Sequence, residues 1–290
     1  MKAIRIVACA SLLASLPSVV TAAQDRTEPK TTTTEVKNTK LKRVGGDLVG
    51  MSLVTPKNDL LGKVEDVVIH PKGDVAFVEV TGSGVLKTGT KRFAVPWNAL
   101  TCNENGQFVL ATTPEAFAKM PFYDKKANLT DMEWWIDNDR KYAKLVSAKA
   151  TPAEASSSLA PAKILYLGSD LRSRSIEDPE GAKIATMHEV VVDPRAGRIA
   201  YVVLSVGGGL GAGEKMIAVP WEALKSMPDK SNPKLDRLTL STTKEKLEQA
   251  PEFQATTTGW TTASEPDYVL RVYEYYTVPP YRLESRTEPQ

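Results

Sequence analysis

The fold is decided by the stretch 181–224, which reads GAKIATMHEVVVDPRAGRIAYVVLSVGGGLGAGEKMIAVPWEAL. The stretch 61–100 reads LGKVEDVVIHPKGDVAFVEVTGSGVLKTGTKRFAVPWNAL and follows the same pattern. Residues 67–71 align with residues 190–194, and both stretches carry Ala-Val-Pro-Trp near their ends, with one residue gained or lost at the intervening turn. Similarity in this order over a domain-sized span indicates two diverged copies of one unit.

Within each copy the apolar pattern is typical of short strands. Val64–Ile69 and Val75–Val80 flank Pro-Lys-Gly, and Ile184–Val192 and Ile199–Val206 flank Asp-Pro-Arg-Ala-Gly. Proline followed by glycine is turn chemistry, so each pair predicts a hairpin. Five or six short strands with brief turns favour a small closed barrel. We expect further strands at Asp47–Val54, Lys91–Val95, Gln107–Ala111, Ile164–Arg172, Glu214–Val219 and Arg237–Leu240.

Short helices are expected after each barrel, at Pro114–Lys119, Asp131–Leu145, Lys244–Gln249 and Glu265–Tyr276. Trp97 and Trp221 each follow a proline that ends a strand and begins a helical turn. We expect each tryptophan to plug the end of its barrel in preference to forming a ligand platform. The predicted fold is mainly β, with two small barrels, each carrying short C-terminal helices, joined by a linker.

This pattern resembles the PRC-barrel family. The residues that carry the resemblance are the Val-rich strand with Asp-Pro at 190–194, the Ala-Tyr-Val-Val strand at 199–203, the glycine run at 206–211 and Ala-Val-Pro-Trp. The first copy departs from it, because His70 replaces the aspartate and Thr81–Val85 replaces the run of glycines. The resemblance implies a six-stranded barrel that contacts other macromolecules and carries no shared catalysis.

The first residues predict export. Lys2 and Arg5 precede an apolar run at Ile6–Val20, and small residues follow, which is the order found in a secretory signal peptide cleaved near Ala23. Cleavage removes two of the 37 basic residues and leaves all 35 acids, so the mature chain is formally neutral. A neutral chain without a basic stripe argues against nucleic acid as a partner. We expect a periplasmic or otherwise exported protein with no transmembrane segment after cleavage.

The expected organisation places the signal peptide at residues 1–23 and a disordered lead-in at 24–44. The first barrel with its helical extension spans 45–145, a linker 146–163, the second barrel with its extension 164–281, and a tail 282–290. The oligomeric state is left open.

Candidate sites of catalysis are poorly supported by the sequence. The glycine run at 207–213 is followed by Glu214 and a strand, whereas a phosphate loop needs Gly-Lys and a helix. His70, in a turn expected to be solvated, and His188 lie in different copies without nearby ligands, and Cys102 lacks a histidine partner. The pair Glu65-Asp66 is interpreted as a solvated strand face. No catalytic residue, metal site or cofactor is predicted.

The leading hypothesis is therefore a non-enzymatic module that binds or scaffolds unidentified envelope proteins in the periplasm or cell envelope. Apolar residues at the tips of glycine-rich hairpins offer a docking contact, and these partner-binding candidates are Val85, Leu86, Gly209 and Leu210. The alternative is a small-molecule-, lipid- or metal-binding periplasmic module, which requires a concave pocket with a few polar groups.

Overall fold

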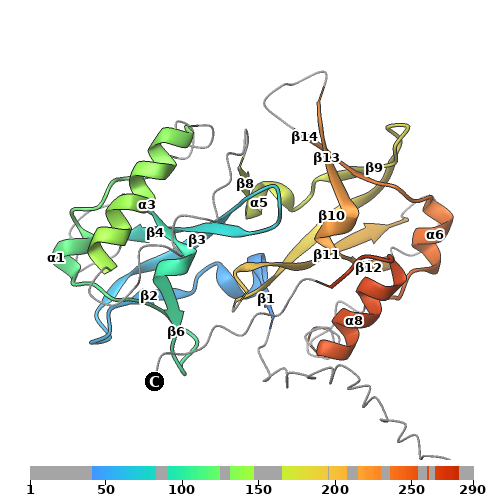
Figure 1. The fold of residues 1–290 in the computed structure, drawn as a ribbon. Helices are drawn as coiled ribbons and strands as arrows, with labels where there is room; N and C mark the ends of the chain where they lie inside the picture. Colours follow the sequence, from blue (N-terminus) through green and yellow to red (C-terminus); the bar gives the residue numbers. More distant parts are fainter. Residues whose placement is uncertain are drawn as a thin grey trace, which may run out of the picture. The chain divides into compact units, whose positions relative to one another are not determined.

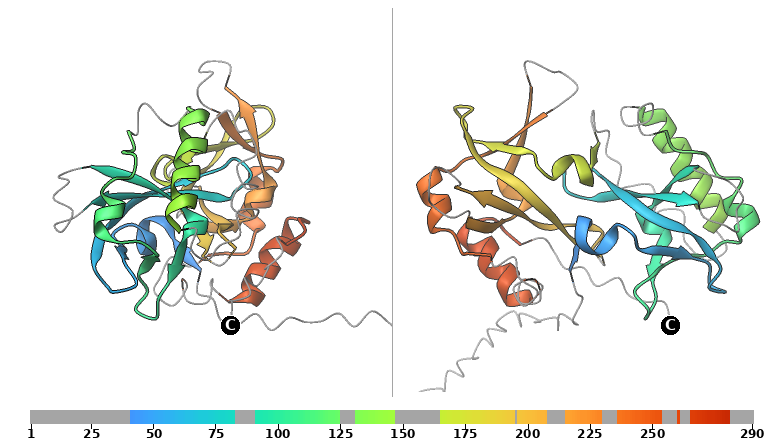
Figure 2. Two further views of the ribbon diagram at one scale, coloured as in Figure 1. Left: turned by 60° about the vertical axis from the view of Figure 1, so that its left-hand side comes forward. Right: turned by 180° about the vertical axis from the view of Figure 1, so that it is seen from behind.

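The computed structural model describes residues 41–82, 91–124, 131–146, 165–194, 196–207, 215–229, 236–253, 260 and 265–280. Among these residues each copy is built on a seven-stranded sheet (Figures 1 and 2). The predicted mainly β fold with two units and short helices is confirmed, and each of the two sheets is half-barrel-like. The predicted signal peptide lies outside the described residues, as do the tail after Tyr281 and nearly all of the predicted linker.

The first copy begins with strand β1 (Lys42–Arg43) and one helical turn, η1 (Val44–Leu48). Its sheet has the strand order β5-β4-β3-β2-β7-β6, in which only β2 and β7 of this path run parallel. The bounds are β2 (Ser52–Val54), β3 (Leu60–Ile69), β4 (Val75–Gly82), β5 (Arg92–Pro96), η3 (Trp97–Ala99), β6 (Leu100–Cys102), β7 (Phe108–Leu110), α1 (Pro114–Phe117) and α3 (Met132–Val146).

The second copy repeats this order as β12-β11-β10-β9-β14-β13, with β9 and β14 parallel. The bounds are β8 (Tyr166–Leu167), α5 (Gly168–Leu171), β9 (Ser175–Glu177), β10 (Lys183–Asp193), β11 (Arg198–Val206), β12 (Lys215–Val219), η4 (Trp221–Ala223), β13 (Leu224–Pro228), β14 (Asp236–Leu240), α6 (Lys244–Gln249) and α8 (Pro266–Tyr275).

Two predicted strands contain a helical turn. In Ile164–Arg172 only Tyr166–Leu167 form a strand, and in Asp47–Val54 the strand begins at Ser52. Gly168-Ser169-Asp170 offers no β-branched side chain, and the amide of Ser169 donates to Asp66 Oδ1 at 3.0 Å, which satisfies an otherwise orphan N–H at the helix start. The predicted lead-in also ended too late, because Lys42–Val44 belong to β1 and η1.

The hairpin strands alternate between two hydrophobic clusters. In β10, Val190 and Val192 join a core that also holds residues of the first copy, whereas Val191 lies in a separate cluster beneath α8. In β3, Val67 and Val68 divide in the same way, with Val68 in a cluster beneath α3. A strand that is buried on both faces has a nearly continuous run of apolar residues, which explains the valine-rich sequences of β3 and β10.

An outer helix closes each cluster. Helix α3 packs against β5 in the first copy and α8 against β12 in the second (Figures 1 and 2). Trp135 of α3 is fully buried, with its ring centroid 4.4 Å from that of Phe77 on β4. Tyr273 of α8 donates its hydroxyl to the carbonyl of Ala200 at 2.7 Å. Aromatic packing of this kind buries large apolar areas and fixes each helix on its sheet.

The short first strand of each copy pairs with the sheet of the other copy. Strand β1 lies antiparallel to β10, with Lys42 opposite Val192, and β8 lies antiparallel to β3, with Tyr166 opposite Ile69. The two copies therefore exchange their first strands, a relation that their sequence similarity alone did not predict.

The hairpin turns are held by the same kind of reciprocal contact. The amide of Val75 donates to the carbonyl of Gly197 at 2.8 Å, and the amide of Ile199 donates to the carbonyl of Gly73 at 2.7 Å. The two turns make this reciprocal contact although one residue was gained or lost between them, so each turn is bonded to the other copy.

The two tryptophans extend this contact. Trp221 donates its indole N–H to the carbonyl of Pro71 at 2.9 Å, and a Cβ at Gly73 would lie 2.6 Å from the Cδ1 atom of Trp221. A Cβ at Gly197 would lie 2.7 Å from the corresponding atom of Trp97. Both tryptophans are buried in the shared core, and each also packs against the turn of the opposite copy.

We call these reciprocal contacts, in which each hairpin turn meets the turn and the tryptophan of the other copy, the interlock. Replacing Gly73 by alanine tests the interlock. Gly73 has φ +92°, so Gly73→Ala combines left-handed backbone strain with a clash against Trp221. We expect a loss of about 2–4 kcal/mol in the free energy of unfolding, measured by urea denaturation. Gly106→Ala is the matched control, because Gly106 also has positive φ but no atom within 4 Å of the added Cβ, and should cost about 1 kcal/mol. Equal losses in the two variants would contradict the interlock.

Candidate functional site

The four predicted partner-binding residues lie outside the described residues. The structure describes the strands that lead into both hairpins, with Thr81 opposite Arg92 in the first copy and Val206 opposite Lys215 in the second. The strand pairs of the two predicted hairpins are therefore present, and the role of Val85, Leu86, Gly209 and Leu210 stays a prediction.

His70 does not behave as the sequence suggested. Its side chain is buried, and its Nδ1 atom accepts a hydrogen bond from the amide of Lys72 at 3.1 Å. The burial follows from the contact of this turn with the other copy, which a local reading of Pro-Lys-Gly cannot reveal. His70 therefore has a structural place in the turn.

Cys102 lies at the end of β6 with an exposed side chain. Partial burial of the thiol nonetheless raises the pKa of Cys102, and the nearby charge of Lys42 offsets this only in part. Reactive cysteines need a lowered pKa. Across the described part of the chain no group of three or more His, Cys, Asp or Glu side chains is arranged to hold a metal ion.

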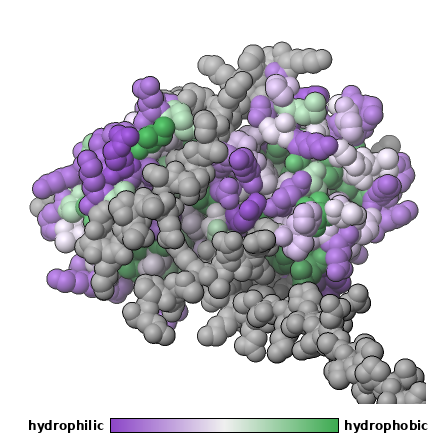
Figure 3. Space-filling model, in the orientation of Figure 1, coloured by the Kyte–Doolittle hydropathy of each residue, from purple (hydrophilic) through white to green (hydrophobic). Residues whose placement is uncertain are grey.

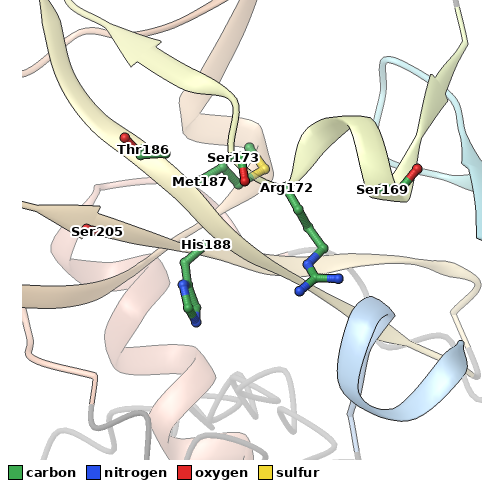
Figure 4. Close-up of a pocket in the computed structure, with 7 residues that line it drawn as sticks. All are labelled: Ser169, Arg172, Ser173, Thr186, Met187, His188 and Ser205. Atoms are coloured by element: carbon green, nitrogen blue, oxygen red, sulfur yellow. The ribbon is translucent and has the colours of Figure 1, made fainter.

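A polar pocket of about 540 Å³ opens in the second copy (Figure 4). It is formed by the end of α5, the turn that follows it, and strands β10 and β11. All but one of its lining side chains carry a hydroxyl or a nitrogen, the exception being Met187. The lining residues are Ser169, Arg172, Ser173, Thr186, Met187, His188 and Ser205. The pocket therefore combines a permanent cation, an imidazole and several hydroxyl groups.

A β-bulge presents His188 to this pocket. In the pairing of β10 with β11, Met187 lies opposite Leu204 and Glu189 opposite Val203, so His188 is an extra residue without an opposite number. A bulge re-aims the side chain that it carries. His188 is exposed, and Figure 4 shows it extending to the same side of β10 as Arg172.

Ser173 holds an unusual backbone conformation at the edge of the pocket. Its φ is +72°, which a residue with a Cβ adopts only at a cost, and its amide donates to the carbonyl of Met187 at 2.7 Å. The same position in the first copy is Gly50, with φ +87° and the equivalent hydrogen bond to Val64 at 2.8 Å. The second copy thus has a serine, with its hydroxyl, at a position of positive φ where the glycine of the first copy is unstrained.

Arg172 is supported by an acid and a glycine. Its Nε atom lies 3.6 Å from Glu189 Oε1, and that oxygen also accepts from the amide of Gly45 at 3.1 Å and the amide of Val190 at 3.0 Å. Gly45 lies directly against the guanidinium of Arg172, so a side chain at this position would displace the end of the arginine. The side chain of Arg172 remains 44% exposed, which leaves it accessible from the pocket.

Asp66 anchors the other side of α5. It is fully buried and accepts from both the amide and the hydroxyl of Ser169 in addition to the amide of Val67. The prediction that Glu65-Asp66 forms a solvated face is right for Glu65 and wrong for Asp66. Glu189 occupies the equivalent place in the second copy and accepts a hydrogen bond from the amide of Gly45. Asp66 and Glu189 therefore each hold the helical turn, α5 or η1, that comes from the other copy.

The model of the PRC-barrel domain matches the chain over residues 45–117 and again over residues 164–247, which together make up more than half of its length. The chain belongs to the PRC-barrel family. A search among curated proteins gave no match. PRC barrels are in general a non-catalytic domain family. The two matched segments coincide with the two copies identified from the sequence, so the tandem arrangement of PRC barrels is confirmed.

Sequence reasoning missed every residue of the pocket in the second PRC barrel. His188 was considered only as a metal ligand, Arg172 was the last residue of a predicted strand, and Ser173 lay just beyond that strand. A signal was nevertheless present in the repeat, because the corresponding residues of the first barrel are Val49, Gly50 and Glu65. A change from apolar, glycine and acid to Arg, Ser and His within one short region marks where the copies diverge in chemistry.

Replacing Asp66 tests whether its carboxylate holds the two PRC barrels together. Asp66→Ala leaves the amide and hydroxyl of Ser169 without their acceptor in a buried place, and we expect a loss of about 2–4 kcal/mol in the free energy of unfolding. Asp178→Ala is the control, because Asp178 accepts one amide in an exposed turn and its loss should cost about 1 kcal/mol. The assignment fails if Asp66→Ala and Ser169→Ala destabilise the protein additively in a double-mutant cycle.

Proposed function

We propose that this tandem PRC-barrel protein is a non-enzymatic module that binds or scaffolds other proteins in the periplasm or cell envelope. The generally non-catalytic nature of the family supports the absence of enzyme activity. The raised pKa of Cys102 and the buried, internally bonded His70 support it further, because neither group is prepared for nucleophilic or acid–base chemistry.

The observation that carries the proposal is a pair of exposed apolar side chains at matching positions of the outer helices. Ile136 of α3 is 47% exposed and Leu270 of α8 is 44% exposed, although each helix buries its opposite face against a sheet. In the repeat, Glu133–Ile136 corresponds to Asp267–Leu270, so the two residues are equivalents. Figure 3 shows a mostly hydrophilic surface over α3 with a small apolar spot, which suits a limited docking contact.

The interlock of the two copies gives this pair a further use. Because the copies share a core and exchange their first strands, the folded sheets and not the residues between them fix the spacing of Ile136 and Leu270. A partner that engages both helices gains from a fixed effective concentration at the second contact. We propose bivalent binding as the reason for keeping two copies, with the hairpin tips at Val85, Leu86, Gly209 and Leu210 as additional contacts.

The alternative function, a small-molecule-binding module, is favoured by one observation, the polar pocket of the second barrel. No helix in the described parts of the chain is long and apolar enough to cross a membrane. A pocket and a docking surface use different residues, so the two functions are compatible in one protein.

Charge placed at both outer helices should abolish partner capture. Ile136→Asp with Leu270→Asp introduces a desolvation penalty into an apolar contact, and we expect capture of specific partners from envelope extract to fall about tenfold or more, measured by quantitative affinity pull-down. Arg140→Gln with Arg271→Gln is the matched control, because it changes the net charge of the same two helices by the same amount and leaves both apolar residues in place. Equal capture by the two double variants would refute this docking surface, and a matching set at Val85, Leu86 and Leu210 then tests the hairpins.

The proposed export is tested separately by fractionation of the producing cells. We expect the protein in the periplasmic or envelope fraction with a mature N-terminus near Gln24, determined by mass spectrometry of the intact chain. Lys2→Glu with Arg5→Glu removes the positive start of the signal and should retain the uncleaved chain in the cytoplasm. A cytoplasmic, uncleaved wild-type protein would rule out the periplasmic assignment.

A further inference from the structure

We propose that the pocket of the second barrel is a binding site for a small oxyanion, a phosphate or carboxylate group. This site goes beyond the proposed docking function and shares no residue with the outer helices. Its core consists of Arg172, Ser173 and His188, which line one pocket from the turn after α5 and from strand β10, with the side chains of Arg172 and His188 extending to the same side of β10 (Figure 4).

The guanidinium of Arg172 is prepared for an external anion. Its contact with Glu189 Oε1 at 3.6 Å exceeds hydrogen-bond length, and that oxygen already accepts two amides, from Gly45 and Val190. Glu189 thus orients Arg172 without accepting a hydrogen bond from the N–H groups of its guanidinium. A guanidinium at 44% exposure in a concave polar site is the group best suited to bidentate recognition of phosphate or carboxylate.

Hydroxyl groups and an imidazole complete the donor set. Ser173 stands directly beside Arg172 in the chain, and His188 is brought to the pocket by the bulge in β10. Thr186 and Ser205 lie opposite each other in the pairing of β10 with β11 and also line the pocket. Buried Met187 contributes an apolar element to the lining. Hydroxyls and a cation in the lining of the pocket favour an oxyanion over an apolar ligand.

Backbone strain at Ser173 is the independent sign of function. A serine at φ +72° is less stable than a glycine in the same conformation, and the equivalent Gly50 shows that the fold accepts glycine there. Strained residues persist at sites where the side chain has a use. The side chain that justifies this cost is a hydroxyl that lines the pocket.

The first barrel supplies the contrast within one chain. Its equivalents of Arg172, Ser173 and His188 are Val49, Gly50 and Glu65, which provide no cation, no hydroxyl and one negative charge. Glu65 is exposed on the corresponding bulge of β3, so an anion would meet repulsion there. The oxyanion site therefore belongs to the second barrel alone, and the first barrel prescribes the substitutions that should remove it.

Titration calorimetry at low ionic strength tests the proposal, with inorganic phosphate and citrate as probes of the wild-type protein. Arg172→Val and His188→Glu install the residues of the first barrel, and each should raise the Kd by about tenfold or more. Arg140→Ala removes one cation from α3 and should leave the Kd unchanged. Co-sedimentation with phosphatidylglycerol vesicles forms a second arm, in which binding that Arg172→Val abolishes assigns the oxyanion to a lipid headgroup.

Ser173→Gly separates binding from folding. It relieves the positive-φ strain, so we expect the Tm to rise by about 2–4 °C while the Kd for the probe increases. A residue with a merely structural role would not produce these opposite changes. The proposal is overturned if neither probe nor vesicle binds the wild-type protein, or if Arg172→Val and Ser173→Gly bind as tightly as wild type. Loss of the oxyanion site would leave partner capture by Ile136 and Leu270 untouched, so the two proposals fail independently.

Discussion

The structure depends on two hydrogen bonds that cross between the copies, from the amide of Val75 to the carbonyl of Gly197 and from the amide of Ile199 to the carbonyl of Gly73. Each turn must present a glycine carbonyl at positive φ, and each must leave room for the tryptophan of the other copy. These demands can only be met reciprocally. A duplicated domain that folds in this way behaves as a single cooperative unit, since neither sheet completes its edge or its core alone.

The exchanged segments also determine where chemistry can arise. Asp66 and Glu189 each hold the helical turn that enters from the other copy, and the residue that follows that turn must adopt positive φ to reach its partner strand. The first copy meets this requirement with Gly50. In the second copy Ser173 occupies the position, next to an arginine that rests on Gly45. In the second copy this position lies at the edge of the polar pocket.

The sequence predicted best those features that depend on local chemistry. Helix α6 matches its expected bounds, Lys244–Gln249, because Thr243 accepts the amide of Lys246 and caps the first turn. The long strands β3, β4, β10 and β11 were evident from β-branched residues. Features set by the other copy were not evident. The two-residue strands β1 and β8 are too short to show a period, His70 is buried in a turn that the other copy contacts, and Asp66 beside exposed Glu65 resembles part of one polar face.

The bulge in β10 explains why the alternation of buried and exposed side chains along the strand did not predict the pocket. Inserting one residue at His188 breaks the period of two, so that Met187 and Glu189 keep buried positions while His188 leaves the ladder. Strict alternation places Met187 and Glu189 on one face of the strand and His188 on the other. It therefore predicts neither that Glu189 supports Arg172 nor that His188 lines the same pocket. A comparison of the two copies at bulges and positive-φ positions is more informative than periodicity, because these positions combine a fixed backbone with a free choice of side chain. In this chain that comparison identifies Arg172, Ser173 and His188 of the second copy, which correspond to Val49, Gly50 and Glu65 of the first.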